Sequence, residues 1–349
     1  MKAIIFSSIG TPRNTSSEAV ADYIRNYLGD KHVISAPQPI RRRIIEKRIL
    51  PGHLPHSVAR YTALSDLYGG ELPLRIYGER LRLRLQQLVG DTHSIYNFSL
   101  HEGKDTLTPF IQKIQEDGPF SEITIFSLYP HHTFSSSIST IEPLKASLKF
   151  FFPETTLHIV HSYWSDKRYI SAIVKRIQER LAEAQYDHIA ISFHSIPLVH
   201  QWFGCWYGFN YFQQCKKTAQ LITQALPDGH PSTGLYFQSA IGKKWLKPNI
   251  EQALPEWLRL NYKRVLVACP GFLMDCLENV YDIGVVLQKQ FIEVGGECCS
   301  LAESLNDSTD LAELIAQLVQ ETESTKSRRP SNRVTYRSKN NIFIFNQKY

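Results

Sequence analysis

Residues 187–197 read DHIAISFHSIP, a short apolar run that ends on a histidine and a turn. An uninterrupted run of this length, rich in β-branched residues, predicts a strand that is buried on both faces of a parallel sheet. In open α/β sheets, ligands bind beyond the carboxyl ends of the strands. His194 stands at such an end, so it is a candidate for chemistry, although a histidine there can also be a satisfied core residue.

Comparable runs recur along the chain and alternate with segments of helical period. Helices are expected from a Thr15-x-x-Glu18 capping box onward and over residues 169–181. Because strand–helix alternation favours a parallel sheet flanked by helices, and because it occurs twice, the sequence predicts two similar α/β domains. The further strands are expected at residues 2–7, 122–128, 157–161, 234–238 and 263–269. The expected domains are 1–162, joined by a helix at 308–322, and 163–305, followed by a tail at 323–349.

Composition excludes several classes of protein. The chain has 349 residues, of which 43% are hydrophobic and 21% charged, as in ordinary soluble globular proteins. The formal net charge is +6, and seven basic residues with no acid lie between Lys326 and Lys348. The folded part is therefore close to neutral, and no nucleic-acid partner is expected.

Targeting signals and cysteines indicate the compartment. The apolar run before Ser7 is too short for the core of a signal peptide, and no segment approaches the roughly 18 apolar residues of a membrane span. The six cysteines contain no CxxC pair and are expected to be reduced thiols. These features predict a cytoplasmic protein.

Two regions depart from the strand–helix pattern. Residues 36–60 combine prolines with a basic cluster, and they indicate either a solvated connecting helix or a mobile lip over a cleft. The polar, basic tail is expected to be disordered. Binding of the tail to a membrane surface is the alternative, so peripheral membrane association stays open.

A second strand end carries a cluster of acids. The stretch CPGFLMDCLE (269–278) breaks a strand at Pro-Gly and begins a helix on which Asp275, Glu278 and Asp282 share one stripe. The stripe is either a solvated helix face or a set of carboxylates that faces His194. An imidazole and a carboxylate together can take up protons near neutral pH or bind a divalent metal. Cys276 is expected to pack away from the stripe.

At this point the motifs resemble those of ferrochelatases, in the same order and at similar separations, over about residues 2–322. The resemblance implies two Rossmann-like, chelatase-type domains with a cleft between them, and insertion of Fe²⁺ into a porphyrin as the last chemical step of haem synthesis, with release of two protons. The motifs are SFHSIP (192–197), YFQSAIGKKWLKP (236–248), CPGFLMDCLENVYDIG (269–284), IGTP (9–12) and LYPHHTFSSSIST (128–140).

The resemblance also assigns roles to single residues. It implies that His194 and Glu278 are catalytic and bind the iron, with Asp282 as a further catalytic acid. Porphyrin contacts fall on Ile9, Tyr129, Trp245 and Phe272. An aliphatic residue at position 9 favours protoporphyrin IX over coproporphyrin. Porphyrin and ferrous iron are then the substrates, no tightly bound cofactor is implied, and the cysteine-free tail predicts no iron–sulfur cluster.

Some positions differ from the family's usual pattern. Ser99 and Leu100 replace an arginine and a tyrosine, Ala240 replaces a basic residue, and residues 200–215 replace a Gly-Asp-Pro-Tyr stretch. These positions bear on porphyrin contact, and they keep other functions open. The alternatives are a coproporphyrin ferrochelatase, a cobalt or nickel chelatase acting on a sirohydrochlorin-type ring, and a non-catalytic tetrapyrrole-binding protein. The sequence carries no signal for the oligomeric state.

Overall fold

The chain divides into two compact units in a computed structural model that describes residues 1–324. Unit 1 comprises Met1–Tyr163 together with the segment that starts at Asp307, and unit 2 comprises Trp164–Asn306. The sequence had placed the domain limits at 162 and 305. Most of the predicted tail lies outside the described residues, but positions 323 and 324 form the end of the last helix.

Each unit is built on a four-stranded, fully parallel sheet, which confirms the predicted fold class. The sequence missed one edge strand in each sheet, β2 and β8. In unit 1 the strand order is β2 (His93–Ser99), β1 (Lys2–Ser8), β3 (Glu122–Ser127) and β4 (Thr156–Val160). In unit 2 the order is β6 (Ser232–Gln238), β5 (His188–His194), β7 (Arg264–Ala268) and β8 (Cys298–Leu301).

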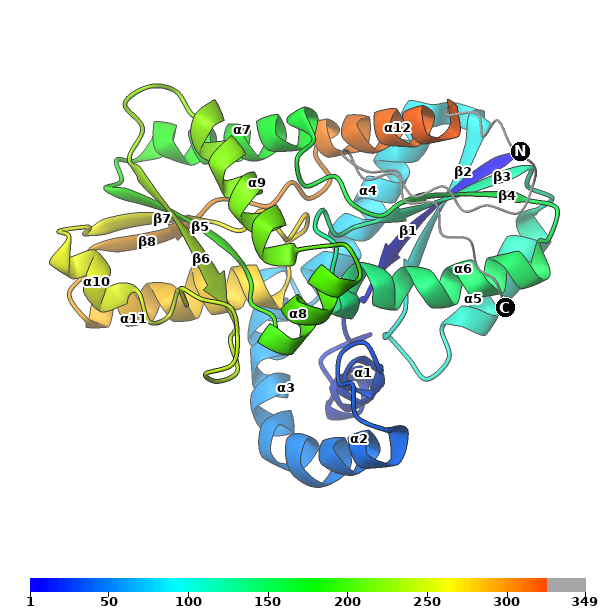
Figure 1. Ribbon diagram of the computed structural model, residues 1–349, viewed down its shortest axis with the longest axis horizontal. Helices are drawn as coiled ribbons and strands as arrows, with labels where there is room; N and C mark the ends of the chain where they lie inside the picture. The colour runs from blue at the N-terminus through cyan, green and yellow to red at the C-terminus, as the bar shows by residue number, and fades with distance from the viewer. Residues whose placement is uncertain (325–349) are drawn as a thin grey trace. The chain divides into compact units, whose positions relative to one another are not determined.

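Helices cover both faces of the unit 1 sheet (Figure 1). The helices α5 (Leu107–Asp117) and α6 (Ser139–Phe151) pack on one face against alternate residues of the strands, such as Ala3, Ile5 and Ile125. The helices α4 (Pro73–Val89) and α12 (Thr309–Ser324) contact each other and cover the other face. A 3₁₀-helix, η2 (Gly90–Thr92), and a π-helix, η3 (Phe134–Ile138), complete this part.

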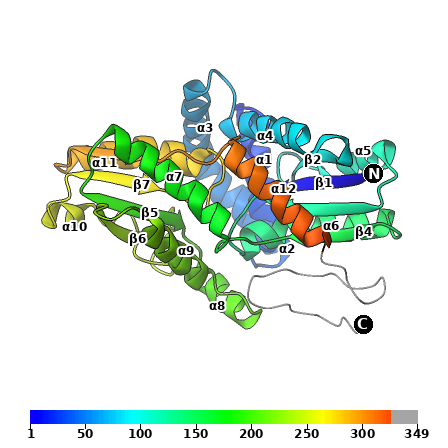
Figure 2. The same cartoon turned by 90° about the horizontal axis from the view of Figure 1, so that it is seen from above.

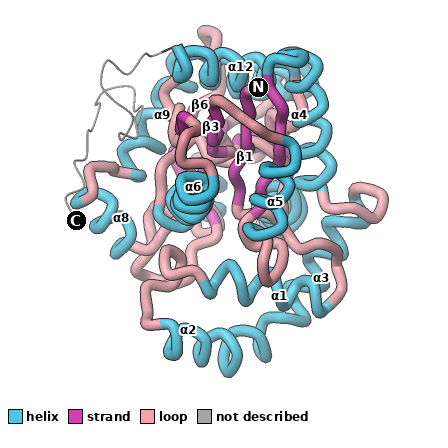
Figure 3. Tube along the Cα trace, turned by 90° about the vertical axis from the view of Figure 1, so that its right-hand side faces the viewer, coloured by secondary structure: helices cyan, strands magenta, loops and turns pink. Residues whose placement is uncertain are grey.

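A group of helices follows β1 in unit 1 (Figure 3). It contains α1 (Ser17–Gly29), α2 (Gln38–Ile44), η1 (Ile45–Ile49) and α3 (Leu50–Leu67), joined by a small core of Ala21, Ile45 and Leu50. Residues 38–60 are therefore helical throughout, as the connecting-helix interpretation of this region predicted. The predicted capping box was wrong by one residue, because the N-cap of α1 is Ser16, whose hydroxyl accepts from the Ala19 N–H.

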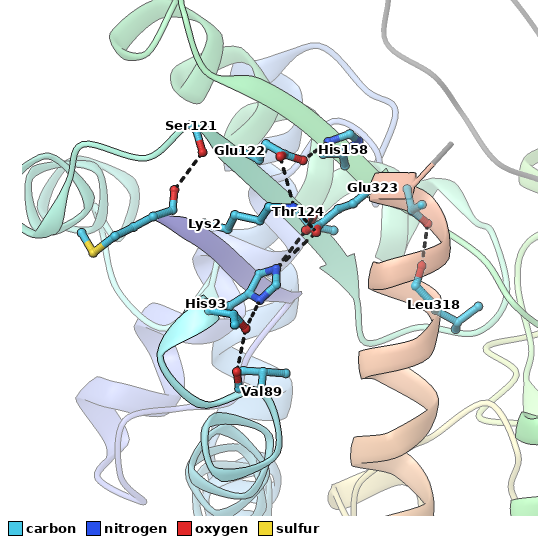
Figure 4. Close-up of polar contacts among 12 residues, drawn as sticks. Lys2, Val89, His93, Ser121, Glu122, Thr124, His158, Leu318 and Glu323 are labelled. Carbon is cyan, nitrogen blue, oxygen red and sulfur yellow. Dashed lines mark hydrogen bonds and ion pairs between the residues drawn. The ribbon is translucent and has the colours of Figure 1, made fainter. Parts of the chain in front are cut away.

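One buried carboxylate fastens α12 to the sheet of unit 1 (Figure 4). Glu323 accepts hydrogen bonds from Lys2 Nζ at 2.8 Å, from Thr124 Oγ1 at 2.9 Å and from His93 Nε2 at 3.2 Å. These three donors come from β1, β3 and β2. Burial alone would raise the pKa of Glu323, but the bonds from these donors outweigh it and lower the pKa to about 2. The network therefore holds α12, which follows unit 2 in the chain, against the sheet of unit 1.

Unit 2 is also a three-layer structure. In Figure 1, α7 (Lys167–Glu183) and α9 (Tyr211–Ala225) lie on one side of its sheet, with α10 (Leu254–Arg259) and α11 (Gln288–Glu293) on the other. Trp257 and Phe291 fill the second layer against Val265 and Val267. The remaining helices are α8 (Leu198–Trp206) and η4 (Leu277–Leu287). Within residues 1–324, no helix is both long enough and apolar enough to cross a membrane.

Candidate functional site

His194 is the last residue of β5, the strand between β6 and β7 in the sheet of unit 2. Its Nδ1 lies 2.5 Å from the main-chain oxygen of Ser195. Because a carbonyl oxygen can only accept, Nδ1 carries the hydrogen of this contact, which leaves Nε2 as the nitrogen that can accept a proton. His194 is half-buried, so its ring is accessible to a ligand. The sequence was right to place this histidine at a strand end.

The end of β5 is held in place by the segment after β6. The Ser195 N–H donates to the Gln238 carbonyl at 2.8 Å, and the Ser195 hydroxyl donates to the Leu246 carbonyl at 3.1 Å. Trp245 lies in an isolated antiparallel bridge with Pro197, three residues after His194. The predicted binding residue Trp245 is thus brought close to the strand tip that carries the histidine.

Gln238 connects the two predicted catalytic residues, and the sequence analysis gave it no role. It pairs with His194 in the register of β5 and β6, and its side chain is fully buried. Its Oε1 accepts from the Ser192 hydroxyl at 2.8 Å, while its Nε2 donates to the main-chain oxygen of Glu278 at 2.6 Å. The sequence does carry one signal for Gln238, because it is a polar residue at the end of an apolar strand, as His194 is on the neighbouring strand.

Glu278 lies at the start of η4, which is a π-helix and not the α-helix that the sequence predicted. The Asn279 Oδ1 organises this start, since it accepts from the Cys276 N–H at 2.7 Å and from the Val280 N–H at 2.9 Å. Because the i→i+5 bonding of a π-helix makes its turn wider than that of an α-helix, Glu278 and Asp282, four residues apart, project from nearly the same side.

Asp275 does not belong to the acidic stripe, contrary to the prediction. It precedes the helix and is buried, and its Oδ2 accepts from the Asn306 Nδ2 at 2.9 Å. The Asp275 N–H donates back to the Asn306 Oδ1 at 2.9 Å. The reason for the error is that the helix starts two residues later than its sequence pattern indicated. Asp275 is a structural residue that joins this turn to the segment after β8.

Two further side chains define the surroundings of this strand end. The rings of Phe272 and His194 lie edge to face, with their centroids 6.4 Å apart. Phe272 also packs partly against the core of unit 2. Burial, and then the neighbouring Glu278 carboxylate, raise the pKa of the Cys276 thiol well above its usual value. Cys276 therefore lies beside the glutamate rather than away from the acids, and its thiol stays protonated at neutral pH.

Ile9 and Tyr129, the other predicted binding residues, lie together in unit 1. The Ile9 N–H donates to the Tyr129 hydroxyl at 2.9 Å. Both follow the carboxyl ends of adjacent strands, β1 and β3. The next residue, Gly10, has a positive φ of 83°, and a Cβ there would lie 2.9 Å from the Ser99 Cβ. Only glycine allows this turn, which fixes the backbone next to Ile9.

A family model described as Ferrochelatase matches residues 1–323. The chain belongs to the ferrochelatase family. Ferrochelatases of Coxiella burnetii (strain CbuK_Q154) and Francisella tularensis subsp. novicida (strain U112) are each 29% identical to it, over 333 and 325 residues. These alignments cover 90% and 92% of this chain, and 92% and 95% of the two relatives. As a ferrochelatase homologue, the protein is a metal-chelatase enzyme of haem biosynthesis, and its family implies porphyrin and ferrous iron as substrates.

Two solved structures share the fold of this ferrochelatase family member. SirB from Bacillus subtilis with Fe³⁺ has a TM-score of 0.50 at 10% identity, covering 71% of this chain and 89% of that one. The sirohydrochlorin chelatase SirB from Bacillus subtilis subspecies spizizenii in complex with cobalt has a TM-score of 0.50 at 11% identity, covering 72% and 92%. At such low identity the likeness establishes the chelatase fold alone.

The positions that depart from the usual ferrochelatase pattern have local partners here. The Ser99 hydroxyl lies 3.2 Å from the Ser8 hydroxyl, and Leu100 packs against the core of unit 1. Ala240 follows Ser239, which has a positive φ of 60° in the turn after β6. Residues 200–215 form most of α8 and the first turn of α9. Ser99 thus ends β2, whereas the other positions lie in turns and helices outside the strands.

The described residues contain no group of three or more His, Cys, Asp or Glu side chains arranged to hold a metal ion. The assignment of His194 and Glu278 as ligands of the substrate iron stays a prediction.

Proposed function

We propose that this enzyme inserts Fe²⁺ into protoporphyrin IX and releases the two pyrrole protons, with His194 as the first proton acceptor. The observation that carries the proposal is the Nδ1 contact of His194 with the Ser195 carbonyl, which leaves Nε2 as the basic nitrogen. A neutral imidazole has a proton affinity suited to chemistry near neutral pH.

The reaction requires the protein to accept protons and to bind the incoming cation. Two pyrrole N–H bonds of the ring break and four Fe–N bonds form, so one Fe²⁺ enters the ring and two protons leave it. His194 Nε2 takes a pyrrole proton, and Glu278 with Asp282 binds the incoming cation or passes protons to solvent. Carboxylates are suitable for both tasks, because they are basic and their charge balances that of the ion.

Aromatic and aliphatic side chains supply the binding surface for the flat ring. Phe272 and Trp245 are grouped at the strand end that carries His194, and such side chains line pockets for apolar ligands. A ring bound away from planarity is easier to metallate, because its pyrrole nitrogens are then exposed. In unit 1 we assign Ile9 and Tyr129 to porphyrin binding. The aliphatic Ile9 supports protoporphyrin IX, which has two carboxylates where coproporphyrin has four.

The test is an anaerobic metal-insertion assay on the full chain with three rings, protoporphyrin IX, coproporphyrin III and sirohydrochlorin, each with Fe²⁺ and Co²⁺. The proposal expects the highest kcat/KM for Fe²⁺ with protoporphyrin IX, at least tenfold above the other rings. A preference for coproporphyrin would overturn the substrate while retaining the enzyme class. Cobalt insertion into sirohydrochlorin alone would replace the proposed activity with that of a different chelatase.

The proposal also states that the cysteines are reduced and hold no iron–sulfur cluster. All six cysteines are free thiols, which supports a reducing, cytoplasmic setting. We infer no resident iron–sulfur cluster, because the tail at 323–349 contains no cysteine. Anaerobically purified protein should therefore lack the broad visible absorption of such a cluster. Stoichiometric acid-labile sulfide in that protein would contradict this part.

A further inference from the structure

The peptide unit between His194 and Ser195 is hydrogen-bonded at both of its polar groups. The His194 carbonyl accepts from the Tyr211 hydroxyl at 2.9 Å. On the other side of the same peptide, the Ser195 N–H donates to the Gln238 carbonyl at 2.8 Å. Because a peptide unit is planar, bonds at its oxygen and at its nitrogen fix the orientation of the plane. The main chain that carries the imidazole is therefore held from two elements, β6 and the start of α9.

The orientation of the imidazole depends on this same stretch of main chain. His194 Nδ1 bonds to the Ser195 carbonyl, which belongs to the next peptide unit. The Ser195 hydroxyl donates in turn to the Leu246 carbonyl at 3.1 Å. A shift of the His194–Ser195 peptide would therefore move the acceptor that holds the ring, and Nε2 would move with it.

Tyr211 is the first residue of α9, and its phenol lies inside unit 2. The residue is only 6% exposed. Burial, and then the neighbouring Cys215 thiol, raise the pKa of the Tyr211 hydroxyl well above its usual value. The hydroxyl therefore stays protonated at neutral pH and can donate to the His194 carbonyl. Such burial also keeps the phenol away from a bound ring, so Tyr211 can act on the reaction only through His194.

The start of α9 is itself fixed by α8, the helix that precedes it. The Asn210 side chain caps α9, since its Oδ1 accepts from the Gln213 N–H at 3.0 Å. The same Oδ1 accepts from Gln201 Nε2 at 2.6 Å, and Gln201 Oε1 accepts from the Phe212 N–H at 3.0 Å. Figure 2 shows α8 at one end of α9. The residues on both sides of Tyr211 are thus held, which fixes its side chain against the end of β5.

A second buried tyrosine makes an equivalent contact at the next strand end. Tyr169, on α7, is fully buried, and its hydroxyl donates to the Pro270 carbonyl at 2.6 Å. Pro270 lies in the turn that follows β7 and leads to Phe272. The helices α7 and α9 contact each other, and each supplies one phenol. This helical layer therefore holds the ends of both β5 and β7, the two strands that precede the predicted site residues.

We propose that Tyr211 is a positioning residue for the insertion reaction, because its hydroxyl fixes the His194–Ser195 main chain and, through it, the imidazole. The inference rests on the proposed role of His194 as proton acceptor. A displacement of about 1 Å in a reacting group can cost up to about 100-fold in rate. The segment 200–215, which departs from the family's usual sequence, thus contributes a bond that orients the proposed base.

The test is Tyr211→Phe in the full chain, since phenylalanine keeps the ring and removes only the hydroxyl. In Fe²⁺ insertion, kcat should fall about five- to tenfold, while the KM for porphyrin stays within about twofold of wild type. In protein with ¹³C-labelled histidine and no substrate, the His194 ring signal, assigned by its absence in His194→Ala, should broaden or divide. A role in packing alone would lower the melting temperature and leave both this signal and kcat unchanged.

Tyr236→Phe is the matched control. The Tyr236 hydroxyl accepts from Trp257 Nε1 at 2.9 Å and lies 3.1 Å from His188 Nε2, at the other end of β5. This variant also removes a phenol hydroxyl from unit 2, but its kcat and its His194 signal should match wild type.

Three results would overturn the proposal: an unchanged His194 signal in Tyr211→Phe, a kcat of that variant within twofold of wild type, or equal changes in Tyr236→Phe. If wild type metallated none of the rings, the proposed function would fail. The His194 signal, which is read without substrate, would then alone decide whether Tyr211 positions the imidazole.

Discussion

The side-chain amide of Gln238 donates a hydrogen bond of 2.6 Å to the main-chain oxygen of Glu278. Gln238 is also the register partner of His194, so one buried amide links the strand that carries the proposed base to the helix that carries the proposed carboxylate. The contact lies wholly inside unit 2. The contact gives His194 and Glu278 a common support, although 84 positions separate these two residues in the sequence.

We predict that Gln238→Leu lowers both stability and insertion rate. The substitution leaves the Ser192 hydroxyl and the Glu278 carbonyl without their buried partner, at a cost of about 1–3 kcal/mol. Urea unfolding will measure the loss. The insertion rate should fall by about tenfold, with a larger change in the KM for Fe²⁺ than in that for porphyrin, because the start of η4 shifts.

Ser192→Ala is the matched control for that change, because it removes one donor to Gln238 and leaves the bond to Glu278 in place. Its insertion rate should stay within about twofold of wild type. If Gln238→Leu showed wild-type kinetics at a reduced stability, the amide would be a core residue with no part in positioning Glu278.

His194→Ala should abolish insertion, with a fall of at least about 100-fold in kcat, because it removes the proposed proton acceptor. The fold should persist, since the ring is only half-buried. His230→Ala is the matched control: His230 makes the same kind of Nδ1 contact with the following carbonyl, at 2.6 Å, but it precedes β6 at the opposite end of the sheet. Comparable loss in both variants would refute a special role for His194.

Glu278→Gln should reduce the insertion rate by about 10- to 100-fold, because an amide neither accepts a proton at neutral pH nor balances the charge of the cation. The main-chain bond to Gln238 remains, so thermal stability should change little. Glu293→Gln, at an exposed acid that pairs with Lys289 in the same unit, is the control and should be neutral. Steady-state kinetics with Fe²⁺ as the varied substrate will separate binding from turnover.

Glu323 makes the stability of unit 1 dependent on acid pH. Its folded pKa of about 2 lies below the ordinary value of 4.5, so its contribution is complete above pH 4.5 and disappears as the pH falls toward 2. The size is on the order of 3 kcal/mol. Glu323→Gln should lower the free energy of unfolding at pH 7, and the difference from wild type should vanish near pH 2. Glu313→Gln, at an exposed position of α12, should show no such dependence.

The sequence alone determined the parallel sheets, because buried central strands such as Ile189–Phe193 must be continuously apolar and their connections must be helices. It also located His194 and the turn after Cys269, since polar residues directly after such strands are conspicuous. It missed β2, which reads HSIYNFS, because polar residues interrupt its apolar ones, and it missed β8, Cys298–Leu301, because that strand has only four residues.

Only the tertiary structure decided how the site and surface are built. The pairing of Gln238 with Glu278, and of Asp275 with Asn306, joins residues far apart in the chain, and a buried amide has no sequence signal until its partners are known. The i→i+5 bonding of η4 likewise replaced the expected α-helix. In α8 the apolar residues Leu198, Trp202 and Trp206 are exposed, while Gln201 bonds to Asn210 and to Phe212 at the start of α9. Local pattern specifies the faces of an element, and long-range packing decides what covers them.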